Sequence, residues 1–223
     1  MRWLTRIYEN VLSGILADEA GLGKTIQAIA LIAHLRAKDV FGPFLIVAPQ
    51  IILPNWVREF DKWLPECNVC RYHGNAQDRA SLWNGPLHPR GKRNPNYPIV
   101  ITSCEILIKD TRTLSKLGEC VFMVVDEGQR KNHRCALLQS LKSIPSSMRL
   151  LLSGTIQNNF DELWSLLNFV NPKMFHDSRF GFLDVMFRNA NYFTEEGQIL
   201  SEQRTHSTVS KLHEIPRPFY CAG

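Results

Sequence analysis

The feature that most constrains this 223-residue chain is a glycine-rich turn, Asp18-Glu19-Ala20-Gly21-Leu22-Gly23-Lys24-Thr25. An apolar run, Gly14 to Ala17, precedes the turn and predicts a buried strand. Residues Lys24 to Ala37 contain no Gly or Pro and carry apolar residues at helical spacing, which predicts a helix. A strand, a glycine-rich turn and a helix in this order are typical of sites that hold nucleotide phosphates.

The residue types in the turn fit a phosphate-binding loop. Gly21 and Gly23 allow backbone N–H groups to approach phosphate oxygens, and the start of the helix favours negative charge. Lys24 is expected to reach the β- and γ-phosphates of ATP, and Thr25 to ligate Mg²⁺. Because Asp18 stands where the strict pattern has glycine, an ordinary glycine-containing turn is the alternative interpretation.

The rest of the chain alternates apolar runs with helical segments, which predicts a parallel sheet. The clearest further strands are residues 44–48, 99–102, 122–125 and 150–152. Pro54 to Leu64 predicts a connecting helix that carries Trp56 and Trp63 in the core. Strands that are apolar on both faces belong in a sheet covered by helices on each side, so we expect a three-layer α/β fold.

Composition narrows the class of protein. The apolar content of 44% is enough for a packed core, and no apolar run approaches the roughly 20 residues of a membrane-spanning helix. Six scattered cysteines and no hydrophobic leader predict free thiols in a reducing intracellular compartment. Cys67 and Cys70 form one C-x-x-C without a second pair, which favours buried thiols over a zinc site. The net charge of +5 permits a polyanionic partner without identifying one.

Two carboxylates, Asp126 and Glu127, follow directly on the predicted strand 122–125. Ligands of parallel sheets bind at the carboxyl ends of strands. In a phosphate-loop enzyme, the first acid holds Mg²⁺ and the second polarises the water that attacks the γ-phosphate. A pair of helix-capping residues is the alternative, and the upstream phosphate loop favours the functional interpretation.

Ser153, Gly154 and Thr155 follow the predicted strand 149–152, so three polar clusters far apart in sequence are expected at one edge of one sheet. Small hydroxyl residues at this edge can relay the state of the γ-phosphate to a neighbouring surface. Strand-to-helix turns also use Ser, Gly and Thr, so a simple turn is an equal alternative.

Together these motifs resemble the ATPase motor of Swi/Snf-like chromatin remodellers, within the superfamily of DExx-box helicase-like proteins, and in particular the lymphoid-specific helicase type. The segments that carry the resemblance are LADEAGLGKT (16–25), LIVAPQIILPNW (45–56), IVITS (99–103), VVDEGQ (124–129) and LLLSGTIQNNFDELWSLLNF (150–169). The resemblance implies a RecA-like ATP-binding lobe over residues 1–175. It also implies a partial bridge over 176–223 toward a second lobe that is absent.

The resemblance implies ATP and Mg²⁺ as cofactors, double-stranded DNA and nucleosomes as partners, no membrane association and a nuclear location. Proteins of this family hydrolyse ATP between two lobes and use the cycle to move along DNA. By resemblance, residues 18–25 bind the nucleotide, Lys24 and Glu127 are catalytic, and Thr25 and Asp126 hold the metal. The positions implied to couple hydrolysis to movement are Gln129, Ser153, Gly154 and Thr155.

Several positions depart from the family pattern. Ala20 replaces a methionine and Gln129 replaces a histidine, while the segments 130–132 and 155–157 are each one residue shorter than usual. The glutamine-bearing segment that recognises adenine is also missing. Because the resemblance implies that a second lobe supplies arginines to the site, we expect the isolated chain to bind ATP without efficient hydrolysis. A catalytically inactive module that binds DNA or chromatin through basic residues such as Lys92 and Arg93 is the main alternative, and an unrelated phosphate-loop enzyme is a third.

Overall fold

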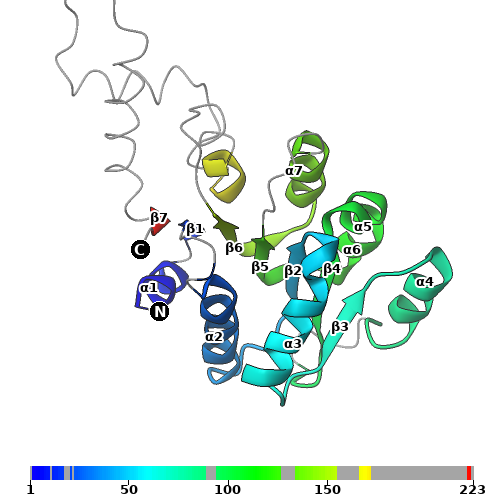
Figure 1. The fold of residues 1–223 in the computed structure, drawn as a ribbon, viewed down its shortest axis with the longest axis horizontal. Coiled ribbons are helices and arrows are strands. Elements are labelled where there is room, and N and C mark those ends of the chain that lie inside the picture. Colours follow the sequence, from blue (N-terminus) through cyan, green and yellow to red (C-terminus); the bar gives the residue numbers. More distant parts are fainter. Residues whose placement is uncertain are drawn as a thin grey trace, which may run out of the picture.

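A single parallel sheet organises the computed structural model, which describes residues 2–10, 12–17, 21, 23–88, 94–126, 134–154, 166–171 and 220–221 (Figure 1). The strand order is β3-β4-β2-β5-β6-β1-β7, and every pairing among the described strands is parallel. The strands are β1 (Gly14–Ala17), β2 (Phe44–Ala48), β3 (Val69–Tyr72), β4 (Ile99–Ser103), β5 (Cys120–Asp126), β6 (Ser146–Ser153) and β7 (Tyr220–Cys221).

Helices cover both faces of this sheet, so the predicted three-layer α/β fold is confirmed. The first three helices pack on one face, and the later helices pack on the other (Figure 1). The helices are α1 (Arg2–Glu9), α2 (Lys24–Arg36), α3 (Leu53–Trp63), α4 (Ala76–Asn84), α5 (Cys104–Lys109), α6 (Thr111–Leu114) and α7 (Arg134–Lys142), with a short helix at residues 166–170. Two 3₁₀ turns, η1 (Gln50–Ile52) and η2 (Ser115–Leu117), complete the described elements.

The strands are apolar throughout because each face of the sheet has its own core. In β5, Phe122 and Val124 pack toward α1, α2 and α3, whereas Met123 and Val125 pack toward α5, α6 and α7. Successive side chains of a strand point to opposite faces, so a strand buried on both sides needs apolar residues at every position. All five residues of β2 are buried for this reason.

The sequence predicted one side chain of α3 wrongly. Trp56 is 1% exposed, as expected for a core residue, but Trp63 is 48% exposed. The Trp63 indole N–H donates to Glu59 Oε2 at 2.9 Å, and the Lys62 ammonium lies 4.8 Å from the ring centroid. Leu64, directly after the helix, occupies the core instead. Trp63 can remain outside because its polar group is satisfied and part of its ring is covered.

The cysteines support the prediction of free thiols. Cys67, Cys70, Cys104 and Cys120 form no disulfide. Burial raises the pKa of Cys70 to about 11, which keeps this thiol protonated at neutral pH. Within the described part of the chain, no group of three or more His, Cys, Asp or Glu side chains is arranged to hold a metal ion.

None of the described helices is long and apolar enough to cross a bilayer.

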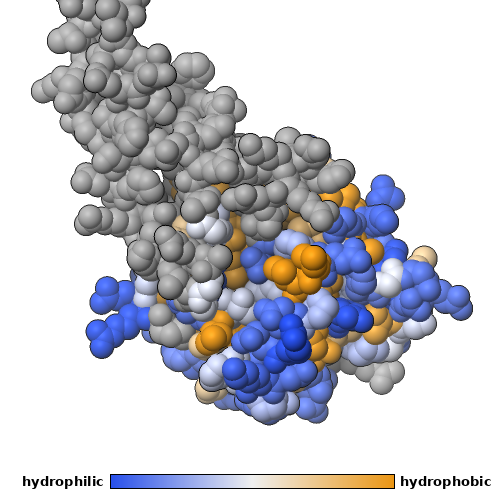
Figure 2. Space-filling view, in the orientation of Figure 1, coloured by the Kyte–Doolittle hydropathy of each residue, from blue (hydrophilic) through white to orange (hydrophobic). Residues whose placement is uncertain are grey.

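The visible surface of the described residues is mostly hydrophilic, with separated apolar patches (Figure 2). The large apolar side chains that are exposed are Ile26, Ile51 and Trp63. Scattered apolar residues of this kind are normal on a protein surface and do not by themselves identify a docking face.

A polar cluster fastens α4 to the far edge of the sheet. The Asp110 carboxylate accepts hydrogen bonds from Tyr72 Oη at 2.8 Å and from Arg79 Nε at 2.6 Å. Arg79 also donates to the carbonyl of Gly74 at 2.7 Å. Burial alone would raise the pKa of Asp110, but the hydrogen bonds from Arg79 and Tyr72 and the charges of Arg79 and Lys109 hold it below its usual value.

Asp110→Asn is expected to lower the free energy of unfolding at pH 7 by about 2 kcal/mol, because Arg79 loses its charged partner. The folded pKa of Asp110 is lower than the unfolded pKa, so this stabilisation is present above about pH 4 and is lost as the pH falls through the folded value. Urea denaturation at pH 7 and pH 3 tests both statements, with Asp61→Asn on the exposed side of α3 as control. An equal effect of Asp110→Asn at both pH values would contradict the assignment.

Candidate functional site

The start of α2 has the backbone geometry expected of a phosphate-binding loop. Gly21 and Gly23 have φ angles of 90° and 80°, in the left-handed region that favours glycine. A Cβ built on either glycine would meet no other described residue within 4 Å, so no described side chain fills the space beside this backbone. Among the described residues, α2 has no side-chain cap and no acidic residue in its first turn. The positive end of this 13-residue helix is therefore not neutralised by an acidic residue of its own first turn, and a helix end of this kind favours a phosphate group.

The sheet brings the predicted polar clusters to one edge. Leu16 in β1 lies opposite Leu152 in β6, which lies opposite Asp126 in β5. One residue further along, Ala17 lies opposite Ser153. Because β1 and β5 are two strands apart, their carboxyl ends are separated by about 10 Å. This distance allows one bound nucleotide to contact both.

Asp126 ends β5 in a partly buried position beneath α3. Its Oδ2 accepts a hydrogen bond from Trp56 Nε1 at 3.0 Å. Burial raises the pKa of Asp126, while the indole hydrogen bond and the positive charge of Lys24 act in the opposite direction. Lys24, at the first position of α2, thus lies near enough to this carboxylate, which is predicted to bind metal, for its charge to oppose the effect of burial. The fold thus brings Lys24 and Asp126, which are far apart in the sequence, to the same edge of the sheet.

The residues of this edge fit a magnesium-bound nucleotide. Magnesium in nucleotide sites takes one or two carboxylates together with phosphate oxygens and water. Asp126 supplies a carboxylate, and the half-buried Thr25 supplies a hydroxyl in the first turn of α2. Lys24 supplies the positive charge that phosphate requires. These residues would hold the metal and the phosphates, although the described carboxylates do not form a metal cluster of their own.

Several predicted site residues lie outside the described residues. Of the nucleotide loop, the structure describes Gly21, Gly23, Lys24 and Thr25. Of the coupling segment it describes Ser153, which is buried at the end of β6, and the exposed Gly154. The predicted residues that lie outside are Asp18, Glu19, Ala20, Leu22, Glu127, Gln129 and Thr155. The basic residues Lys92 and Arg93 and most of the predicted bridge at 176–223 also lie outside.

The hydrogen bond between Trp56 and Asp126 was not anticipated from the sequence. The helical pattern correctly predicted that Trp56 is buried, but it carried no information on which group the indole N–H contacts. The only available signal is general: a buried indole N–H needs an acceptor, and few acceptors are available inside an apolar core.

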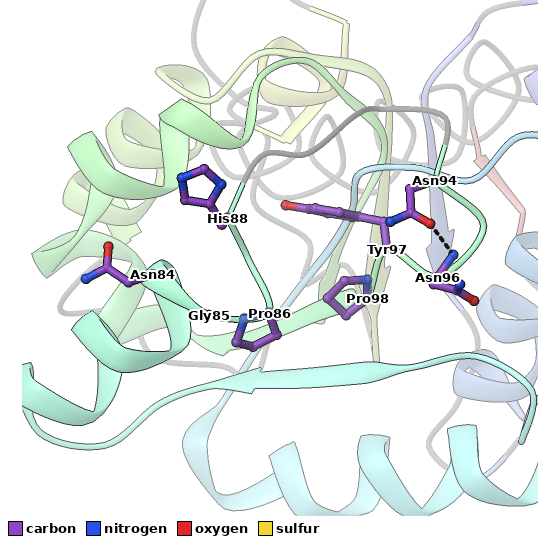
Figure 3. A pocket seen from close by; sticks show the side chains of 8 residues that line it. All are labelled: Asn84, Gly85, Pro86, His88, Asn94, Asn96, Tyr97 and Pro98. Atoms are coloured by element: carbon purple, nitrogen blue, oxygen red, sulfur yellow. Dashed lines mark hydrogen bonds between the residues drawn. The ribbon is translucent and has the colours of Figure 1, made fainter.

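Two cavities are lined by described residues, and neither is the nucleotide site. The first, about 300 Å³, lies before β4 at the amino end of the sheet and is lined by Asn84, Gly85, Pro86, His88, Asn94, Asn96, Tyr97 and Pro98 (Figure 3). The Asn96 backbone N–H donates to Asn94 Oδ1 there at 2.9 Å. The second, about 540 Å³, lies beside β3 and is lined by Arg71, His73, Gly74, Asp78, Ser81 and Leu82. Since β3 is five strands from β1, this cavity is about 24 Å from the phosphate loop.

Known proteins match the chain over nearly its whole length. The SNF2-related domain family matches residues 1–221. The chain is 42% identical to ATP-dependent DNA helicase DDM1 of Arabidopsis thaliana and 40% identical to lymphoid-specific helicase of Homo sapiens. Each match covers 98% of the chain, but the chain spans only 28% and 26% of those proteins. The solved SWI2/SNF2 ATPase core of Sulfolobus solfataricus in complex with dsDNA has a TM-score of 0.72 at 26% identity, over 100% of this chain and 42% of that one.

Proposed function

The chain belongs to the SNF2-related family, and we propose that it forms the ATP-binding first lobe of an ATP-dependent DNA translocase or chromatin remodeller. The observation that carries the proposal is the convergence of Lys24 and Asp126. Lys24 begins α2 after an open glycine turn, Asp126 ends β5 two strands away, and the charge of Lys24 acts on the Asp126 carboxylate. This arrangement suits a magnesium-bound nucleoside triphosphate.

We propose a separate role for each of these residues in nucleotide binding. The backbone at Gly21 and Gly23 and the start of α2 cradle phosphate oxygens, and Lys24 neutralises the β- and γ-phosphates. Thr25 and Asp126 would hold Mg²⁺, one through its hydroxyl and the other through its carboxylate. When bound, Mg²⁺ supplies the charge that neutralises the phosphate oxygens during γ-phosphoryl transfer. Glu127, the next residue along the chain, is proposed to orient and deprotonate the attacking water.

Efficient hydrolysis is proposed to require a second lobe. The chain spans 42% of the solved SWI2/SNF2 ATPase core and about a quarter of the length of DDM1 and lymphoid-specific helicase. Arginines supplied from a second body to a phosphoryl-transfer site contribute about 10³ to 10⁵ in rate. A lobe without them binds ATP and turns it over slowly.

A further proposal concerns the residues that couple the γ-phosphate to DNA. A change at the γ-phosphate is proposed to be relayed toward DNA by Ser153, Gly154, Thr155 and Gln129.

Double-stranded DNA in nucleosomes is the proposed partner, and the nucleus the proposed location. Support comes from relatives, which include a DNA helicase and a subunit of a chromatin structure-remodeling complex, and from the solved SWI2/SNF2 core in complex with dsDNA. A motor that moves along a duplex cannot depend on base identity, so we expect the contacts to be mainly to phosphates. The net charge of +5 is compatible with such contacts.

Calorimetric titration of Mg-ATP into this chain, together with a hydrolysis assay with and without duplex DNA, tests the proposal. We expect saturable binding and turnover close to background in both hydrolysis assays, because the 223 residues assayed correspond to only 42% of the solved SWI2/SNF2 core. Fast hydrolysis at the same rate with and without duplex DNA would indicate a different phosphate-loop enzyme. DNA binding without any ATP binding would favour the inactive DNA-binding module.

A further inference from the structure

The indole of Trp56 contacts the one described carboxylate at the proposed metal site. Trp56 Nε1 donates to Asp126 Oδ2 at 3.0 Å, across 70 positions of sequence. An indole N–H is a donor only and provides a single hydrogen bond of fixed direction. Of the two oxygens of Asp126, the contact therefore engages Oδ2 and restricts how the carboxylate can turn.

The packing around Trp56 holds that donor in place. The side chain is 1% exposed and lies 6.2 Å from the Phe60 ring, between centroids, on the same helix. Trp56, Phe60 and residues of α2 belong to the core on this face of the sheet. Close packing leaves a large ring no room to turn, so the indole N–H is held more rigidly than a polar side chain at the surface.

We propose that Trp56 is a positioning residue for the metal: its indole holds Asp126 Oδ2 so that Oδ1 is presented to the Mg²⁺ of a bound nucleotide. The inference rests on the proposed function and extends it to a residue that touches neither metal nor phosphate. Partners that orient a metal-ligating carboxylate typically contribute 10- to 100-fold to metal affinity. The competing explanation is purely structural, because a buried indole needs an acceptor in any case.

The two explanations differ in how nucleotide affinity depends on metal. We define the metal factor as the affinity for ATP in Mg²⁺ divided by the affinity for ATP in EDTA. Trp56→Phe keeps a ring and removes the donor, so it is expected to lower the metal factor about 10-fold while leaving affinity in EDTA within about twofold of the wild-type value. A structural role would instead lower both affinities together and leave the metal factor unchanged.

A matched control is present on the same helix. Trp63 also donates its indole N–H to a carboxylate, that of Glu59, at 2.9 Å. Trp63, however, is the last residue of α3 and is 48% exposed. Trp63→Phe therefore makes the same chemical change away from the site, and it is expected to leave the metal factor unchanged. Asp126→Asn is expected to reduce the metal factor strongly, and adding Trp56→Phe to it should cause no further loss, because both changes act through one carboxylate.

A second measurement does not require the Trp56 variant to fold. The indole N–H signals of the five tryptophans can be recorded by ¹⁵N-edited NMR and assigned by replacing the other four with phenylalanine one at a time. Mg-ATP is expected to shift the Trp56 signal, whereas ATP in EDTA should shift it much less. Equal shifts with and without metal would overturn the inference.

The results separate failure of the inference from failure of the proposed function. If the wild-type chain binds ATP in neither Mg²⁺ nor EDTA, the proposed function fails and the inference fails with it. If the wild-type chain shows a clear metal factor and Trp56→Phe shows the same one, the proposed function stands and only the role of Trp56 is overturned.

Discussion

Lys24→Ala is expected to lower the affinity of this chain for Mg-ATP by on the order of 100-fold. Lys24 is the first residue of α2, directly after the left-handed Gly23, and its charge acts on Asp126. Removing the ammonium takes away the positive charge proposed to face the β- and γ-phosphates. It also removes a charge that lowers the pKa of Asp126, so this carboxyl is expected to be harder to ionise.

Calorimetric titration of Mg-ATP measures the loss directly, and ligand-induced stabilisation offers a second readout. At a ligand concentration of 100 times the dissociation constant, binding raises the free energy of unfolding by about 2.7 kcal/mol. The wild-type chain should therefore melt at a higher temperature when Mg-ATP is added. Lys24→Ala should show almost no shift at the same concentration.

Lys38→Ala is a suitable control for the loss of a lysine near the same helix. Lys38 follows the other end of α2, about 20 Å away along the helix axis. Its ammonium lies 3.9 Å from Glu9 Oε1, and both side chains are about half exposed, so the pair contributes little to stability. Equal loss of Mg-ATP affinity in the two variants would contradict the assignment of Lys24 and would indicate a general electrostatic effect.

Phe122→Ala is expected to lower the free energy of unfolding by about 4 kcal/mol. Phe122 is 0% exposed in β5, where it lies opposite Phe44 of β2 and Met148 of β6. These neighbours are held in the sheet by backbone hydrogen bonds, so they cannot collapse into the space left by the ring. The loss is a large part of the roughly 5–15 kcal/mol that stabilises an ordinary domain.

Ile51→Ala is the control, because Ile51 is 84% exposed and its truncation removes little buried area. We expect a change within about 0.5 kcal/mol. Urea denaturation followed by circular dichroism compares the two variants with the wild-type chain. A loss below about 1 kcal/mol for Phe122→Ala would mean that the centre of this sheet is less tightly packed than the structure shows.

Local features of the fold were predictable because their causes lie within a few neighbouring residues. The predicted strands Gly14 to Ala17 and 44–48 match β1 and β2 residue for residue. The helix predicted from Lys24 ends at Arg36, one residue before the predicted end. Apolar periodicity, glycine conformation and helix propensity all act over such short stretches. The glycine turn before α2 was recognisable for the same reason.

The exposure of Trp63 shows where this reasoning stops. Seven residues separate Trp56 and Trp63, so helical periodicity places them on nearly the same face of α3. Only the first lies over the sheet; the second lies at the end of the helix among charged side chains. Periodicity determines the direction of a side chain around the helix axis, but it does not determine how far the neighbouring layer extends along that axis.

The sequence by itself determined that this chain folds as an α/β domain with a glycine-rich turn between β1 and α2, because each of these features is encoded in a short contiguous stretch. Only the tertiary structure decided that the indole of Trp56 donates a hydrogen bond to Asp126 and that Lys24 lies near the same carboxylate. Those contacts depend on strand order, on the register of β1, β5 and β6, and on the packing of α3 over β5. Strand order, register and helix packing each depend on many interactions between residues far apart in the sequence, so no single segment encodes them.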